Sequence, residues 1–362
     1  MKIGILTYHR SHNYGALLQA IALRKVLADM GNEVSFIDYW PEYHKHMYDF
    51  FSWRALCEGV TFKEKMKYIK NIVLFPVSRN ERINNFDVFI KENIMPYTSS
   101  LTESYDIVIH GSDQIWRKQP EWNTYNPIYF GKHKIKTKFK ISYAASMGIL
   151  PESDGDKQIL KGYFGNLNEI SAREDDLKRL VCELGYQCRQ DIDPTLLLAG
   201  TNWCNLLKIG SQSTGRYVLY YKLLPDSFSL KMITDFAKQR GLELKILNSS
   251  ASRFKSKKNI TTASPKQFLE LVYNADYVFT SSFHGLVFSI LFHKEFFASF
   301  SKNSGRAASI LSSLDMSQRL LLPNSDIPAD IKKIDYDIVE EKLQDYRCDS
   351  LNYLQKLSVH NM

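Results

Sequence analysis

Short apolar runs alternate with stretches of helical periodicity along most of the chain. Residues 3–8 form an apolar run, apolar residues recur at helical spacing over 16–30, and a second run follows at 34–39. Gly31 ends the helical pattern, and a strand–helix–strand unit of this kind is parallel and right-handed. The same rhythm returns in three later runs, at 105–116, 140–146 and 169–173. The pattern predicts an open α/β domain over residues 1–200.

The rhythm restarts after the Gly/Ser-rich stretch at 210–215, which predicts a second α/β domain over residues 211–330. Residues 331–362 read as a helical segment that packs back on the first domain. The segment 41–100 breaks the rhythm and is crowded with aromatic and basic residues, so we expect it to be an insertion. Two readings of it stay open: helices that cover the sheet, or an amphipathic surface that faces a membrane.

Length and charge narrow the class of protein. A chain of 362 residues is longer than a single hydrophobic core usually accommodates, which predicts two domains. Its net charge of +8 indicates anionic partners. Five cysteines without a CxxC pair suggest neither a disulfide framework nor a zinc cluster, and a metal site at His44 and His46 lacks a third ligand. The amino-terminal apolar run is too short for a signal peptide, and no run spans a bilayer. We expect a cytoplasmic protein without a metal.

The first candidate site is the turn of residues His9 to Gly15, between the first strand and the first helix. Backbone N–H groups at a helix start favour an anion, and we single out Asn13, Tyr14 and Gly15 there. A purely structural Asn–Gly turn with a buried Gln19 explains the same residues equally well.

The second candidate begins at the end of the apolar strand over 105–111. Ser112, Asp113 and Gln114 stand at the edge of an open α/β sheet where ligands bind, and Trp116 offers a ring for a sugar. Asp113 is suited to orient or deprotonate a hydroxyl. The alternative is a helix N-cap by Ser112 or Asp113.

The third candidate is Arg173, which ends a predicted strand just before a helix. Its planar guanidinium suits a phosphate or a carboxylate. An ion pair with Glu174 or Asp175 is the structural alternative, and adjacent residues on an emerging turn seldom pair well.

The fourth candidate lies in the second domain, where a strand leads through a tight turn into an apolar helix. The turn holds Ser282, Phe283, His284 and Gly285, and an anionic substrate beside His284 would favour its acidic, protonated form. Arg306, at the start of another predicted helix, is expected to add positive charge to the same crevice.

The order of six motifs resembles that of the polysaccharide pyruvyl transferase family. The motifs are TYHRSHNYGALLQAIAL, DIVIHGSDQIW, KISYAASMG, ISARE, DIDPTLLL and TSSFHGLVFSILF. The resemblance covers about residues 1–320. It implies a GT-B-like fold, with two Rossmann-like domains that face each other across a cleft. It also implies phosphoenolpyruvate as donor, a sugar as acceptor and no cofactor.

The resemblance also assigns roles. Arg173 stands where the family binds the donor's phosphate or carboxylate, and His284 stands where a histidine binds the donor and acts as acid. The motifs around Asn13 to Gly15 and Ser112 to Gln114 would face the acceptor, with Asp113 as candidate base. Some members carry Arg where this chain has Ser282, so we expect Arg306 or a lysine to compensate.

The product of such a reaction is a pyruvate ketal in a capsular or other cell-surface polysaccharide. We then expect the acceptor to be carried on a polyprenyl diphosphate, with peripheral contact of the protein to the inner face of the cell membrane. Two alternatives stay open. One is a GT-B glycosyltransferase that uses a nucleotide sugar. The other is a non-catalytic protein that binds anions or nucleic acid, although the sequence contains no recognisable nucleic-acid-binding motif.

Overall fold

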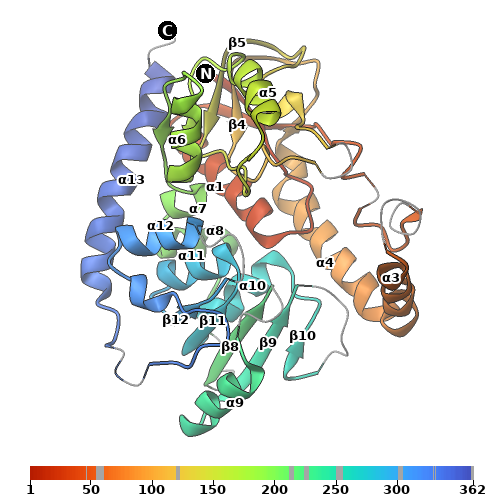
Figure 1. Ribbon diagram of the computed structural model, residues 1–362, viewed down its shortest axis with the longest axis vertical. Coiled ribbons are helices and arrows are strands. Elements are labelled where there is room, and N and C mark those ends of the chain that lie inside the picture. Colours follow the sequence, from red (N-terminus) through yellow and green to blue (C-terminus); the bar gives the residue numbers. More distant parts are fainter. Residues whose placement is uncertain are drawn as a thin grey trace. The chain divides into compact units, whose positions relative to one another are not determined.

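The computed structural model describes residues 1–362 except 46, 54–60, 120–122, 212–215, 224–227, 250–255, 301–304, 329, 331 and 360–362. The chain divides into two compact units (Figure 1). Unit 1 comprises Met1–His44, Ile90–Leu198 and Leu343–Met362. Unit 2 comprises Lys45–Phe89 and Ala199–Lys342.

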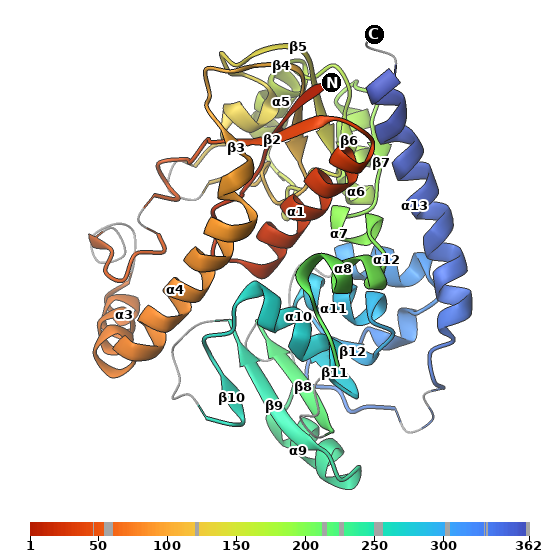
Figure 2. The same cartoon turned by 180° about the vertical axis from the view of Figure 1, so that it is seen from behind.

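Unit 1 is built on a parallel sheet of order β3-β2-β1-β4-β5 (Figure 2). Its strands are β1 (Lys2–Leu6), β2 (Glu33–Ile37), β3 (Thr98–Ser99), β4 (Ser104–Gly111) and β5 (Lys136–Tyr143). Single bridges join β5 to the two-stranded sheet of β6 (Ser171–Ala172) and β7 (Arg189–Gln190). The helical elements of this unit are α1 (Tyr14–Asp29), η1 (Met95–Tyr97), η2 (Pro127–Phe130), α5 (Asp154–Phe164), α6 (Asp175–Glu183) and α7 (Pro194–Leu197).

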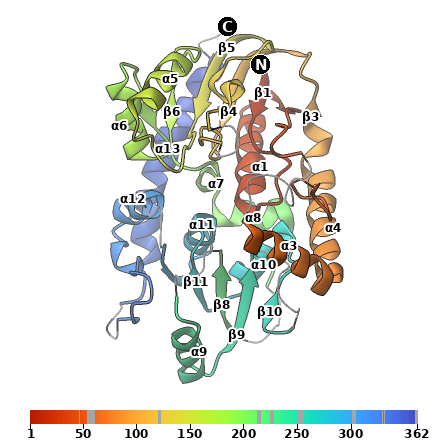
Figure 3. The same ribbon diagram turned by 45° about the vertical axis from the view of Figure 1, so that its right-hand side comes forward.

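Unit 2 repeats this arrangement with a parallel sheet of order β10-β9-β8-β11-β12 (Figure 3). Its strands are β8 (Tyr217–Lys222), β9 (Glu243–Asn248), β10 (Asn259–Ile260), β11 (Tyr277–Thr280) and β12 (Glu295–Ala298). The helical elements within it are α3 (Phe62–Leu74), α8 (Gly200–Leu207), α9 (Leu230–Gln239), α10 (Pro265–Tyr273), α11 (Phe283–Leu291), α12 (Gly305–Ser313) and η3 (Ser317–Arg319).

The central strands of both sheets are apolar because parallel sheets are covered on both faces. In unit 1, β4 buries Ile107, Val108 and Ile109 completely. In unit 2, β11 buries Val278 and Phe279 in the same way. These runs produced the strand predictions, and the predicted fold class of two Rossmann-like α/β domains is confirmed.

The unit boundaries differ from the predicted domains at residues 331–342, which belong to unit 2, and in a longer segment near the amino terminus. The segment 41–100 was expected as an insertion into the first domain, yet Lys45–Phe89 belongs to unit 2. Helix α4 (Pro76–Asn93) explains this, because the Asn85 side chain donates to the Thr262 carbonyl at 2.7 Å and Thr262 donates to Glu81 at 2.9 Å. These contacts are distant in sequence and have no local signal.

The carboxyl-terminal helix α13 (Tyr336–Val359) continues from unit 2 into unit 1. From Leu343 onward it lies along β7, as Figure 2 shows. Arg189 binds Asp349 at 2.8 Å, and Ser350 donates to Asp191 at 2.8 Å. Among the described residues, no helix is both long and apolar enough to cross a membrane.

Candidate active site

The carboxyl edge of the unit 1 sheet is held together by side chains from separate strands. The hydroxyl of Thr7, which follows β1, donates to the carbonyl of Gly111 at the end of β4, at 3.4 Å. Gln19 of α1 is fully buried and donates to the Thr7 hydroxyl at 3.1 Å. Ligands of open α/β sheets bind at this edge. The fold therefore presents the loops after β1, β2 and β4 as candidate binding elements.

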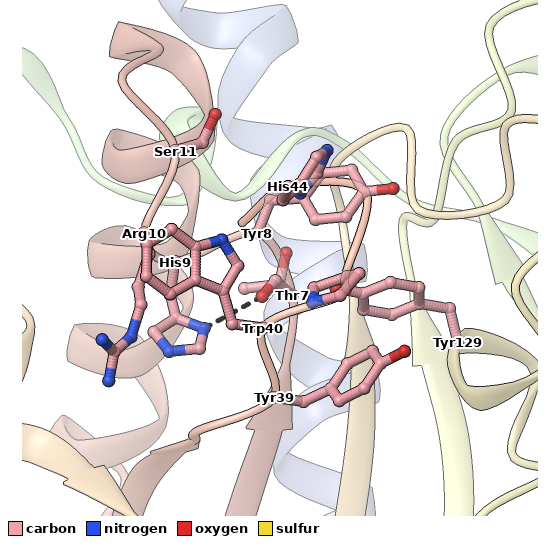
Figure 4. A pocket seen from close by; sticks show the side chains of 10 residues that line it. Thr7, Tyr8, His9, Arg10, Ser11, Tyr39, Trp40, His44 and Tyr129 are labelled. Atoms are coloured by element: carbon pink, nitrogen blue, oxygen red, sulfur yellow. Dashed lines mark hydrogen bonds between the residues drawn. The ribbon is translucent and has the colours of Figure 1, made fainter. Parts of the chain in front are cut away.

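A small pocket with mainly aromatic walls opens at this edge (Figure 4). It encloses about 190 Å³ of space, part of it open to solvent. Its rings come from the loops after β1 and β2 and from η2, and belong to Tyr8, Tyr39, Trp40, His44 and Tyr129. This volume lies below the usual range for ligand sites even with its solvent-open part included, so the pocket is a small aromatic recess.

One wall of the pocket carries an ion pair. The Arg10 guanidinium donates to Asp38 at 2.5 Å and lies 5.4 Å from the centre of the Trp40 ring. The buried His9 ring donates from Nδ1 to the Thr7 carbonyl at 3.0 Å, and its Nε2 lies 3.5 Å from Asp38. The hydrogen bond with His9, followed by the charge of Arg10 and opposed by burial, lowers the pKa of Asp38. This carboxylate therefore fixes both side chains beside Trp40.

The tyrosine hydroxyls of the pocket are available as hydrogen-bond groups. The Tyr129 hydroxyl is fully buried and has no hydrogen-bond partner within the described part of the chain. The Tyr8 and Tyr43 hydroxyls lie 3.2 Å apart. Burial, together with neighbouring tyrosines and Asp113, raises the pKa of Tyr8 and Tyr129 well above the ordinary value. Both hydroxyls therefore keep their protons and remain donors.

The predicted residues Asn13, Tyr14 and Gly15 belong to the start of α1. Asn13 is the N-cap, and its side chain accepts from the Ala16 N–H at 3.2 Å. Tyr14 and Gly15 are buried in the first helical turn. With Gln19 also buried, these contacts match the structural reading of the turn. The pocket is lined instead by the earlier part of the same turn.

Asp113 lies in a turn between strands, and no helix follows it in the described residues before the gap at 120–122. Its carboxylate accepts from the Gln114 N–H at 2.7 Å, while Ser112 is fully buried. The Gln114 side chain packs on Gly148, which adopts a positive φ of 83°. The helix-cap alternative for Asp113 is therefore wrong. Its charge also acts on Tyr8 and Tyr129, which places it near the pocket.

Trp116 is a core residue, which corrects its assignment to the acceptor. Its side chain is fully buried, stacks on Phe130 with ring centres 5.3 Å apart, and meets Phe164 edge to face at 5.0 Å. The indole N–H donates to the Tyr129 carbonyl at 2.9 Å. A fully buried indole whose donor is already in use has nothing left for a sugar. Its large apolar surface, which suggested stacking, serves packing.

His110, at the end of β4, forms a buried pair with His133. Its Nδ1 lies 2.9 Å from the Ile141 carbonyl and its Nε2 lies 3.2 Å from Nε2 of His133. Since Nδ1–H must donate to the carbonyl, His110 Nε2 accepts the proton of His133. Burial, followed by the charge of His133, lowers the pKa of His110 to about 3. Both rings are therefore neutral near pH 7.

Arg173 follows β6 and is held by two carboxylates of its own unit. Its guanidinium donates to Asp193 at 2.5 Å and to Glu174 at 3.3 Å, and its side chain is 3% exposed. Burial opposes its charge, but Glu174, Asp193 and Asp113 together raise the pKa of Arg173. The expectation that Arg173 would pair poorly with its sequence neighbour is wrong, because Glu174 accepts one of its hydrogen bonds. Asp193, after β7, accepts a second one. Carboxylates outnumber the guanidinium here.

In unit 2, the turn between β11 and α11 is shaped by small residues (Figure 3). Ser282 caps α11, and its side chain accepts from the Gly285 N–H at 3.4 Å. A Cβ at Gly285 would lie 2.2 Å from the Thr280 hydroxyl and 2.9 Å from the Tyr221 ring. Ser282 and Gly285 therefore seat the start of α11 against β8 and β11.

The same turn brings together the predicted cationic groups of unit 2. The Arg306 guanidinium, from the first turn of α12, lies 5.3 Å from the centre of the Phe283 ring. The His284 ring meets Phe283 edge to face at the same centre distance, 5.3 Å, and is half-buried. A helix start carries partial positive charge, and the segment Thr280–Gly285 contains no acidic residue. This arrangement favours an anion.

The sequence analysis did not single out the aromatic side chains of the unit 1 pocket. Tyr39, Trp40 and His44 follow β2 directly, and Tyr8 follows β1. An aromatic cluster after two adjacent parallel strands is a signal that could have found them. Tyr129 carries no such signal, because η2 approaches the pocket only through the folded chain.

Comparison with solved structures finds matches along most of the chain at low identity. UDP-GlcNAc 2-epimerase from Neisseria meningitidis bound to UDP-GlcNAc is 11% identical with a TM-score of 0.47, and 99% of this chain and 98% of that chain are covered. The Methanocaldococcus jannaschii UDP-GlcNAc 2-epimerase has 10% identity and a TM-score of 0.46, covering 95% and 92%. A glycosyltransferase from Rickettsia africae has 12% identity and a TM-score of 0.44, covering 99% and 96%. No curated protein sequence matches the chain.

The sequence profile of one family covers most of the chain. It is described as polysaccharide pyruvyl transferase and matches residues 13–300. The matched range includes the β4 and β6 edges of unit 1 and the β11–α11 turn of unit 2. The chain therefore belongs to the polysaccharide pyruvyl transferase family, a family of transferases.

Proposed function

We propose that this protein transfers the pyruvyl group of phosphoenolpyruvate to two hydroxyls of a sugar, forming a cyclic pyruvate ketal. The polymer is a capsular or other cell-surface polysaccharide. One observation carries the proposal: in a member of this family, His284 and Arg306 flank Phe283 at the start of α11, in a segment without acidic residues. An anionic enol phosphate is the donor that suits this charge.

The donor half of the reaction requires an acid and a clamp for negative charge. His284 donates a proton to the methylene carbon of phosphoenolpyruvate, which leaves an oxocarbenium-like centre at the neighbouring carbon. Arg306 and the positive end of α11 stabilise the phosphate and carboxylate groups. Ser282 and Gly285 position the turn, and Phe283 supports both cationic side chains.

The acceptor half requires a base and a place for a sugar ring. One hydroxyl attacks the oxocarbenium-like centre and loses its proton, for which Asp113 is the candidate base. Inorganic phosphate then leaves, and the second hydroxyl closes the ketal with loss of its own proton. Tyr8, Trp40 and Tyr129 would hold the sugar through ring contacts and hydrogen bonds. We assign Arg173 a positioning role, because Glu174 and Asp193 already engage its guanidinium.

The two hydroxyl protons replace the one that His284 gives and the one that phosphate takes up, so the reaction is redox-neutral, and we propose that it needs no redox or nucleotide cofactor and no metal. We further propose that the acceptor sugar is carried on a polyprenyl diphosphate at the inner face of the cell membrane. The net charge of +8 is in keeping with an anionic donor and an anionic lipid carrier.

The proposal is tested by incubating the protein with phosphoenolpyruvate and a panel of lipid-linked and soluble galactose, mannose and glucosamine acceptors. Phosphate release is measured, and mass spectrometry follows the acceptor. We expect phosphate together with an acceptor that gains the mass of one pyruvate less one water. Transfer of a sugar from a nucleotide donor, with no use of phosphoenolpyruvate, would replace this proposal by a glycosyltransferase.

A further inference from the structure

Helix α3 of unit 2 turns an apolar face toward solvent. Phe62 is 79% exposed, Met66 49%, Ile69 41% and Val73 69%. At about 100° per residue, these four positions fall within about 60° of one another around the helix axis. We call these four side chains the α3 stripe. A stripe of this kind normally faces a core, and here it faces outward.

The orientation of α3 is set by the opposite side of the helix. The Tyr68 hydroxyl accepts from the Ser52 N–H at 2.7 Å, and its ring lies 6.5 Å from that of Phe51. The Arg79 guanidinium lies 5.4 Å from the Tyr68 ring and donates to the Phe50 carbonyl at 2.8 Å. These contacts tie the Tyr68 side of α3 to unit 2. The α3 stripe is therefore the side left to solvent.

Further apolar side chains of the same segment are exposed as well. Trp53 is 72% exposed, and Val77, at the start of α4, is 76% exposed. Scattered exposed apolar residues are ordinary, but an aligned set on adjoining elements marks an interaction surface. Figure 3 shows α3 next to the start of α4, the helix that carries Val77.

The charges beside the α3 stripe indicate what it binds. The α3 sequence contains four lysines and one glutamate. Lys65 and Lys70 fall about 60–80° from Phe62 around the axis, one on each side of the stripe. An apolar face bordered by lysines is typical of helices that lie in the interface of an anionic bilayer. A second copy of this basic segment would repel the first.

We propose that α3 docks on a bilayer with anionic headgroups, its stripe inserted among the acyl chains and its lysines at the phosphates. Trp53 suits the headgroup region, because its ring is apolar with one polar N–H. The inference concerns lipid binding and does not depend on the proposed pyruvyl transfer. With that function, docking would bring the enzyme to a lipid-linked acceptor.

The test is sedimentation of the full-length protein with vesicles, in the absence of substrates. Vesicles of phosphatidylethanolamine and phosphatidylglycerol are compared with vesicles of phosphatidylcholine. The variant Phe62→Gln/Val73→Gln shortens the stripe, and Ile149→Gln/Leu322→Gln is its control, because those side chains are 62% and 77% exposed elsewhere. We expect the stripe variant to lower the partition coefficient roughly tenfold or more, and the control to leave it unchanged.

A second variant separates charge from apolar insertion. Lys65→Gln/Lys70→Gln should weaken binding to the anionic vesicles roughly tenfold and leave the weaker binding to phosphatidylcholine unchanged. Circular dichroism melts establish that all variants keep their fold. The inference is overturned if the wild-type protein does not sediment with anionic vesicles, or if the stripe variant sediments equally well. A dimer in solution that the stripe variant dissociates would also overturn it, in favour of a second copy.

Discussion

The two units share one sheet order and differ in the side chains at its carboxyl edge. In unit 1 this edge carries Asp113, Glu174 and Asp193 next to an aromatic pocket. In unit 2 the equivalent edge carries His284 and Arg306 around Phe283. The backbone plan alone therefore does not decide the chemistry. Under the proposed function, this charge difference favours the anionic donor in unit 2 and an uncharged polyol in unit 1.

The largest effect is expected at the imidazole of unit 2. His284→Gln should lower turnover by roughly 10²–10⁴ and change the affinity for phosphoenolpyruvate little, because it removes the acid and keeps the helix start. Steady-state kinetics measure both. The control is His293→Gln, which alters an exposed histidine that pairs with Glu340 in the same unit. Near-normal turnover in His284→Gln would remove His284 as the acid.

The next effect tests whether the arginine of unit 1 is structural. Arg173→Ala should lower the free energy of unfolding by about 3–5 kcal/mol, because it leaves buried carboxylates without their cation. Urea unfolding measures it. Arg179→Ala is the matched control: its ion pair with Asp175 is exposed, so about 0–1 kcal/mol is expected. A stable Arg173→Ala protein that fails to bind phosphoenolpyruvate would assign the donor to unit 1.

The histidine pair of unit 1 predicts a pH effect on stability. Because burial lowers the pKa of His110 to about 3 and of His133 to about 4, the unfolded state takes up these protons first as the pH falls. Stability is then fully present above about pH 6.5 and is lost below it, by about 2 kcal/mol from His110 between pH 7 and pH 5. Urea unfolding at pH 7 and pH 5 measures the free energy of unfolding. The decrease between the two pH values should be smaller in His110→Gln than in the wild-type protein. An unchanged loss would contradict the buried neutral pair.

The smallest effect concerns the pocket hydroxyl. Tyr129→Phe should leave the protein as stable or about 1 kcal/mol more stable, because it removes a buried group without a partner in the described residues. The same change should raise the KM for the sugar several-fold if the hydroxyl binds it. A loss of stability with an unchanged KM would make Tyr129 a packing residue, like Trp116.

The strands and the order of elements follow from the sequence, whereas the partners of the charged residues do not. Apolar runs such as residues 3–8 and 105–111 are local features of the sequence. They can be recognised because a strand of a parallel sheet is buried on both faces and is therefore apolar throughout. Arg173 and Asp193 pair across twenty residues, after two different strands. No residue near Arg173 in the sequence indicates that Asp193 is its partner. The Arg173 guanidinium was therefore interpreted as available to a ligand.

Aromatic residues show the same limit. Trp116 was read as a sugar platform because it follows a strand-end carboxylate, Asp113, but Phe130 and Phe164 fold around it. Tyr129 was not noticed because its neighbours resemble any apolar run. Which ring faces a pocket and which lies in the core depends on contacts between distant segments, and local pattern carries no information on them.

The central claim is that unit 2 binds the anionic donor, and the most direct measurement is the affinity for phosphoenolpyruvate by isothermal titration calorimetry. Arg306→Ala should weaken it roughly tenfold, the loss of a charged hydrogen-bonding contact. Arg240→Ala is the control, because Arg240 lies 3.7 Å from the Phe236 ring centre in the same unit, away from the β11–α11 turn. Binding by Arg306→Ala as tight as that of the wild type would contradict the account.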